Sequence, residues 1–270
     1  LAVAVAGDDV RVEKLEISPP DGPAKLAASA RVRLADEPEF SAQAHWTALQ
    51  WPPRGDPLAA SPEGRLQVDG RPSAYRFETR GKVTAPQAPA TAFDLTGTGD
   101  RAGARIDRLL LELLEGTIET VGSVSWAPEP SWDLGVTLGN IDPGAQWPQW
   151  SGRLKGALST RGRVGEGGAE AALEIGAIEG RLRDYPVMLT AGVQLADRAV
   201  AIERLSLSSG SARVDAAGNI GDSLDLRWSV DARDLAQLLP DSAGSLKGEG
   251  RVTGSREQPR AAARIEGGGL

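Results

Sequence analysis

A large apolar side chain stands at every second position of Trp132-Asp133-Leu134-Gly135-Val136-Thr137-Leu138. A period of two is that of a β-strand with one apolar face and one polar face. The same alternation returns over residues 187–195 and 224–232. The sequence therefore predicts a mainly β fold whose strands are apolar on one side.

The surroundings of this stretch recur along the chain. Residues 202–207 resemble residues 106–111, and Trp228 follows the later copy at the spacing at which Trp132 follows the earlier one. Similarity at a fixed period is typical of repeat proteins, whose units bury their apolar faces by stacking. We therefore expect one elongated β-repeat segment, residues 1–270, of a longer protein, with approximate repeats at residues 12–105, 106–201 and 202–270.

Short helical turns are predicted between some of the strands. Asp142-Pro143 has the form of a helix N-cap followed by proline at the first helical position, and Asp234 opens a similar segment. We also expect a helical turn or loop at residues 47–51, before Pro52. Residues 109–114 suit either a strand or a short helix, and the matching residues 205–208 favour the strand.

Composition excludes several classes of function. The net charge of −7 and the pI near 5.0 argue against nucleic-acid binding, which needs a basic surface. With no cysteine and the single histidine His45, the chain lacks the ligands of zinc or transition-metal sites. No nucleophile motif accompanies His45, which we interpret as a solvated side chain on the polar side of a strand. We therefore expect a protein that is not an enzyme and needs no cofactor.

The apolar strand faces are the informative feature, and they allow two structures. In a closed β-sandwich they meet each other in a dry core. In an open, curved sheet they line a groove for an apolar ligand, and the many alanines and glycines favour this interpretation because small residues leave room. The alternative is a closed sandwich or solenoid in a structural or adhesin-like repeat domain. The predicted groove residues are Leu134, Val136, Leu138, Leu173, Ile175, Val187, Leu189, Val193, Leu195, Leu205, Leu207, Leu224, Leu226, Trp228 and Val230.

Three passages resemble the TamB family, the translocation and assembly module subunits related to AsmA-like proteins. The resemblance covers most of the chain from about residue 100 and is weaker before it. The passages are Trp132-Asp133-Leu134 with Asp142-Pro143, Trp147-Pro148 and residues 152–156; Leu173-Glu174-Ile175 with residues 178–186; and Asp234-Leu235 with Leu239-Pro240 and residues 244–250.

The resemblance implies a β-taco, a long curved sheet folded around a hydrophobic groove. It implies a large periplasmic protein anchored in the inner membrane of a diderm bacterium by a helix outside this segment. It also implies that phospholipid or other apolar cargo is shielded or conducted between the membranes, that outer-membrane protein assembly is assisted with a BamA-like (TamA-type) partner, or both. No catalytic residue comes with the family.

Overall fold

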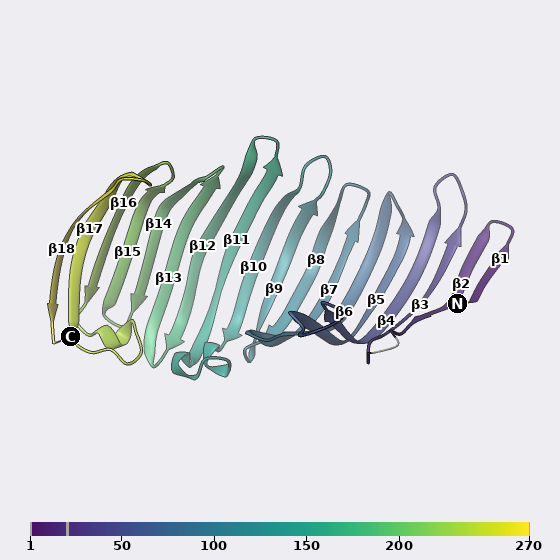
Figure 1. Cartoon of the computed structure of the whole chain (residues 1–270), viewed down its shortest axis with the longest axis horizontal. Coiled ribbons are helices and arrows are strands. Elements are labelled where there is room, and N and C mark those ends of the chain that lie inside the picture. The colour runs from purple at the N-terminus through teal and green to yellow at the C-terminus, as the bar shows by residue number, and fades with distance from the viewer. Residues whose placement is uncertain (1, 20–21, 270) are drawn as a thin grey trace. The chain divides into compact units, whose positions relative to one another are not determined.

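The computed structural model describes residues 2–19 and 22–269 and divides into two compact units. Unit 1 comprises residues 1–113 and 117–128, and unit 2 comprises residues 114–116 and 129–270. Each unit is built almost wholly of β-strands, which carry the numbers β1 to β18 in chain order (Figure 1). The prediction of a mainly β fold is confirmed.

The strands of unit 1 pair in chain order, each antiparallel to the next from β1 to β8, and β9 pairs with β8. Their bounds are β1 (Ala2–Ala6), β2 (Asp9–Ile17), β3 (Lys25–Arg33), β4 (Glu39–Trp51), β5 (Ala59–Arg71), β6 (Ala74–Ala85), β7 (Ala88–Gly99), β8 (Gly103–Leu113) and β9 (Gly116–Ser125).

Unit 2 has the same up-and-down order, with every neighbouring pair antiparallel (Figure 1, teal to yellow). Its strands are β10 (Ser131–Ile141), β11 (Gly152–Gly165), β12 (Gly168–Leu182), β13 (Tyr185–Ala196), β14 (Ala199–Ser209), β15 (Ala212–Ile220), β16 (Ser223–Ala232), β17 (Ser245–Ser255) and β18 (Pro259–Gly268).

The predicted helical turns are present in unit 2 as single 3₁₀ turns. The turn η1 (Pro143–Ala145) begins after Asp142, whose side chain accepts a hydrogen bond from the Gly144 amide, and η2 (Pro148–Trp150) follows it. The turn η3 (Leu235–Gln237) is capped in the same way by Asp234. Both aspartates satisfy an amide that the first helical turn leaves without a partner.

Each sheet is one layer thick, so its apolar face is only partly covered. Strands make substantial contacts with their chain neighbours alone, and among the described residues no second sheet packs on either unit. The buried apolar residues are few and mostly small: Ile141, Ala191, Ala212, Ala232 and Leu235. A dry sandwich core is therefore not formed within either unit.

One local prediction was wrong. Residues 47–51 continue β4, because residues 49–51 still pair with β5 beyond Ala48, which takes a left-handed φ of 53°. Residues 109–113 form part of β8, as the favoured interpretation predicted.

Candidate functional site

The pairing of strands brings the predicted groove residues of unit 2 onto one face, which we call the inner face. Residues directly opposite each other in an antiparallel pair have their side chains on the same side of the sheet. Leu226, for example, lies opposite Gly218 on β15 and Val252 on β17. Following such partners across unit 2 gives adjacent rows of side chains, and every predicted groove residue falls into one of them.

Five rows cross the strands from β10 towards β17. The first contains Trp132, Gly162, Ala171, Leu195, Val200, Ile220, Leu224 and Gly254, and the second contains Leu134, Thr160, Leu173, Val193, Ile202, Gly218, Leu226 and Val252. The middle row contains Val136, Leu158, Ile175, Ala191, Leu205, Ala216, Trp228 and Gly250. The fourth contains Leu138, Gly156, Ile178, Leu189, Leu207, Val214, Val230 and Gly248, and the last contains Ile141, Leu154, Gly180, Val187, Ser209, Ala212, Ala232 and Leu246.

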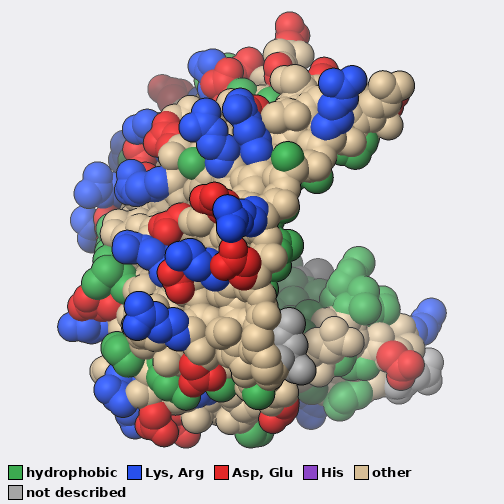
Figure 2. All heavy atoms as spheres, turned by 90° about the vertical axis from the view of Figure 1, so that its left-hand side faces the viewer, with side chains coloured by type: hydrophobic (Ala, Val, Ile, Leu, Met, Phe, Trp, Pro, Cys, Tyr) green, Lys and Arg blue, Asp and Glu red, His purple; other side chains and the backbone are tan. Residues whose placement is uncertain are grey.

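None of the residues in these rows is charged. The predicted groove residues among them are half-buried, neither covered as in a core nor open as on a convex surface. The two hydroxyl groups are both engaged: the Trp132 indole donates to Thr160 Oγ1 at 3.1 Å, and Ser209 donates to the Gln237 carbonyl. Figure 2, which looks from the β18 side, shows many Lys, Arg, Asp and Glu side chains on the surface that faces the viewer.

Charges lie on the opposite, outer face, where many of them pair between neighbouring strands. Lys155 Nζ lies 3.3 Å from Glu179 Oε1, and Arg163 Nη2 lies 2.9 Å from Glu170 Oε2. The Arg251 guanidinium donates two hydrogen bonds to the Asp225 carboxylate, at 2.6 and 2.7 Å. Exposed pairs of this kind add little stability. Their effect is to keep one side of a thin sheet compatible with water.

Sequence reasoning missed several apolar residues of the inner face. Those on β11 were missed because glycines at 156 and 162 interrupt the alternation. Others were missed because β-bulges, which insert one extra residue, let residues three apart face the same side. Ile175 and Ile178 are such a pair, with a register shift between them. The missed large residues include Leu154, Leu158, Ile178, Val200, Ile202, Val214, Ile220, Leu246 and Val252.

Aromatic side chains on the strands lie opposite glycines. A methyl group added to Gly64 or Gly250 would collide first with the indole of the facing tryptophan. Aromatic rings that cover a strand glycine compensate for its missing side chain. The facing pairs are Trp46–Gly64, Trp132–Gly162, Trp228–Gly250, Phe40–Gly70, Tyr75–Gly99, Phe77–Gly97 and Phe93–Gly81.

One edge of the unit 2 inner face is closed by the turn η3. Leu235 is buried against Ala212 and Ala232, and Leu238 and Leu246 pack around them. The Gln237 side chain accepts hydrogen bonds from the Ser211 and Ala212 amides at 2.6 and 3.1 Å. The turn therefore fixes the connection between β16 and β17 against the connection between β14 and β15.

Arg183 joins the same edge to η2. Its Nη1 atom donates to the Ala236 carbonyl at 2.7 Å, and its guanidinium carbon lies 4.9 Å from the centre of the Trp150 ring. The Arg183 amide also donates to the Ser151 carbonyl at 2.7 Å. A cation over an aromatic face is attracted by the ring quadrupole. Arg183 thus connects three separate loops of unit 2.

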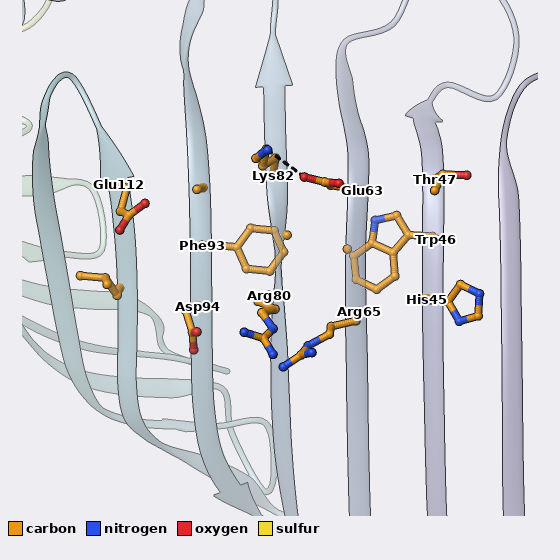
Figure 3. Close-up of a pocket in the computed structure, with 14 residues that line it drawn as sticks. His45, Trp46, Thr47, Glu63, Arg65, Arg80, Lys82, Phe93, Asp94 and Glu112 are labelled. Atoms are coloured by element: carbon orange, nitrogen blue, oxygen red, sulfur yellow. Dashed lines mark ion pairs between the residues drawn. The ribbon is translucent and has the colours of Figure 1, made fainter.

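Unit 1 has a hollow of about 500 Å³ lined by residues of β4 to β8. Figure 3 shows Trp46 of β4 and Phe93 of β7 extending over the two strands between them, and Lys82 paired with Glu63 at 2.7 Å. His45 is exposed on β4, as predicted, whereas its neighbour Trp46 is half-buried. Cationic and anionic side chains around the hollow are equal in number, so it offers a charged ligand no net attraction. The charged residues are Arg65, Arg80, Lys82, Glu63, Asp94 and Glu112.

Comparison with known proteins places the chain in a family. The family model described as "TamB, N-terminal domain" matches residues 11–270. The "Translocation and assembly module subunit TamB" of Haemophilus influenzae is 24% identical over 196 residues, which is 72% of this chain and 15% of that relative. No solved structure matches the chain. None of the described helices is long and apolar enough to cross a membrane. With the family model matched over nearly its whole length, the chain belongs to the TamB family.

Proposed function

We propose that the inner face of unit 2 holds the acyl chains of phospholipids and shields them from water. The observation that carries this proposal is a face without charged residues that is half-buried and covered by no second sheet among the described residues. Moving one methylene group from water to such an apolar surface is favourable by about 0.8 kcal/mol of transfer free energy. An acyl chain would therefore bind without needing any directional contact.

The proposal places this segment in the periplasm of a diderm bacterium, between an inner-membrane anchor and the outer membrane. The chain spans 15% of the Haemophilus influenzae relative's length. The proposal assigns the anchor to another part of the longer protein. Acyl chains would move along the inner face between the two membranes. The paired charges of the outer face support the idea, because they suit a sheet whose outer side stands in water.

A second candidate function rests on the relative's name, which describes a translocation and assembly subunit. The same inner face would then hold apolar segments of unfolded outer-membrane proteins, and a BamA-like (TamA-type) partner would receive them. Both candidates need an open apolar face and no catalytic residue. They differ in whether the bound chain is a lipid or a peptide.

Photo-crosslinking distinguishes these candidates. A photoreactive amino acid at Leu226 faces the inner side, and one at its neighbour Arg227 faces the outer side and serves as the matched control. The expected result, after cell lysis without detergent, is a lipid-sized adduct at position 226 and none at position 227, identified by mass spectrometry. Peptide adducts at position 226 would favour the assembly function. Equal labelling at both positions, or none, would favour a closed structural or adhesin-like domain and contradict the proposal.

A further inference from the structure

Gly250 and Trp228 form a cross-strand pair in the middle row of the inner face. A Cβ atom placed on Gly250 would lie 2.8 Å from each of Nε1, Cε2 and Cζ2 of the indole. Within the ring plane, a point equally distant from three consecutive ring atoms would lie much closer to them than 2.8 Å. The Cβ position therefore lies above or below the ring plane. The indole therefore presents its face to Gly250 and lies flat against the sheet.

The other neighbour of Trp228 in its row is Ala216, so small residues flank the indole on both sides. The short side chains on either side leave space next to the sheet surface. The indole ring can therefore lie along the sheet and does not have to project from it. An upright indole would project much farther from the sheet than the leucines and valines of the adjacent rows. The glycine thus decides the height of the largest side chain among the predicted groove residues.

We propose that Gly250 is a positioning residue for cargo: it keeps Trp228 flat, so that the indole is a platform for an acyl chain and not an obstacle. This inference rests on the proposed lipid-binding function. A residue with high β-propensity, such as valine, could not take over this role of Gly250. Valine is compatible with the inner face in itself, since Val193 and Val230 stand on it, but at position 250 it would lift the indole.

The test compares the lipid content of variants purified without detergent, measured by mass spectrometry of extracted phospholipid per protein. Gly250→Val is expected to lose phospholipid, and Gly250→Ala to lose less. Gly176→Val is the matched control, because a Cβ atom at Gly176 would meet only the Ala157 carbonyl, at 3.9 Å. The double variant Gly250→Val/Trp228→Ala removes the obstacle and is expected to regain lipid. Circular dichroism of each variant checks that the fold is kept.

Each outcome decides between the two proposals. Lipid lost in Gly250→Val and regained in the double variant supports the inference, because a general loss of packing would not be rescued by removing a large side chain. Unchanged lipid in folded Gly250→Val, or no recovery in the double variant, overturns the inference and leaves the proposed function standing. If Gly250→Val does not fold, the same two outcomes are measured with Gly250→Ala. Wild-type protein without lipid overturns the proposed function, and the inference with it.

Discussion

Leu226 of β16 lies directly opposite Val252 of β17 on the inner face. The residue before each of them has its side chain on the outer face. There Asp225 and Arg251 form an ion pair with oxygen and nitrogen 2.6 Å apart. A step of one residue therefore exchanges an uncharged environment for a charged one. This relationship allows substitutions on the two faces to be compared on a single strand.

The outer-face ion pair predicts a pH dependence of stability. A hydrogen bond from Arg251 lowers the pKa of Asp225 below its ordinary value. A carboxyl group whose pKa is lower in the folded state contributes stability above its unfolded pKa and loses it as the pH falls through the folded pKa. Asp225→Asn should therefore melt below wild type at pH 7, and the two melting temperatures should converge in acid. A gap that stays constant down to strongly acidic pH would contradict the assignment.

The cap of η3 predicts a modest stability change with no effect on lipid. Asp234 Oδ1 accepts a hydrogen bond from the Ala236 amide at 3.1 Å. Asp234→Ala should lower the free energy of unfolding by about 1 kcal/mol, measured by urea denaturation. Asp234→Asn keeps an acceptor and is the control. Loss of bound lipid in a stable Asp234→Ala protein would mean that the turn touches cargo.

Arg183 should stabilise the η3 edge of unit 2 by its specific contacts more than by its positive charge. Arg183→Lys keeps the charge but loses the fixed guanidinium plane over Trp150 and the bond to the Ala236 carbonyl. We expect a loss of about 1–2 kcal/mol in unfolding free energy. Hydrogen exchange should also become faster in residues 235–239. Unchanged exchange there would show that Arg183 does not hold the turn.

The small buried cluster should not accept a larger side chain. Ala212 is 1% exposed beneath Leu235, so Ala212→Leu would overpack the site and should cost about 1–3 kcal/mol. Ala217 is on the same strand but exposed, and Ala217→Leu is the matched control. Equal melting temperatures for the two variants would contradict the packing described for this edge.

Most strands and their apolar sides could be predicted from the sequence, because the period of two is a local property. Val187, Leu189, Ala191, Val193 and Leu195 stand at every second position, and all five lie on the inner face, whereas Met188 lies on the outer face. The caps at Asp142 and Asp234 are equally local, since an aspartate needs only the amides of the next few residues.

The remaining features depend on partners far away in the chain. The bulge between Ile202 and Leu205 lets both residues face inward, although their spacing breaks the alternation. Gly162 interrupts the pattern of β11 for a reason that emerges only when Trp132 is found to face it. The division of the chain into three approximate repeats is not tested by these pairings and stays a prediction.

The central claim is that the inner face of unit 2 is open and occupied by acyl chains. The most direct measurement places a photoreactive residue at Val136 and compares Leu226→Arg with Ser229→Arg, which adds the same charge to the outer face of the same strand. An open face lets the new arginine reach water, so Leu226→Arg should stay folded. Its charge should abolish the lipid adduct at position 136, because an acyl chain lying against an unpaired charge costs several kcal/mol. Ser229→Arg should keep the adduct. A wild type without adduct, together with a Leu226→Arg protein that unfolds because it buries an uncompensated charge, would contradict the account.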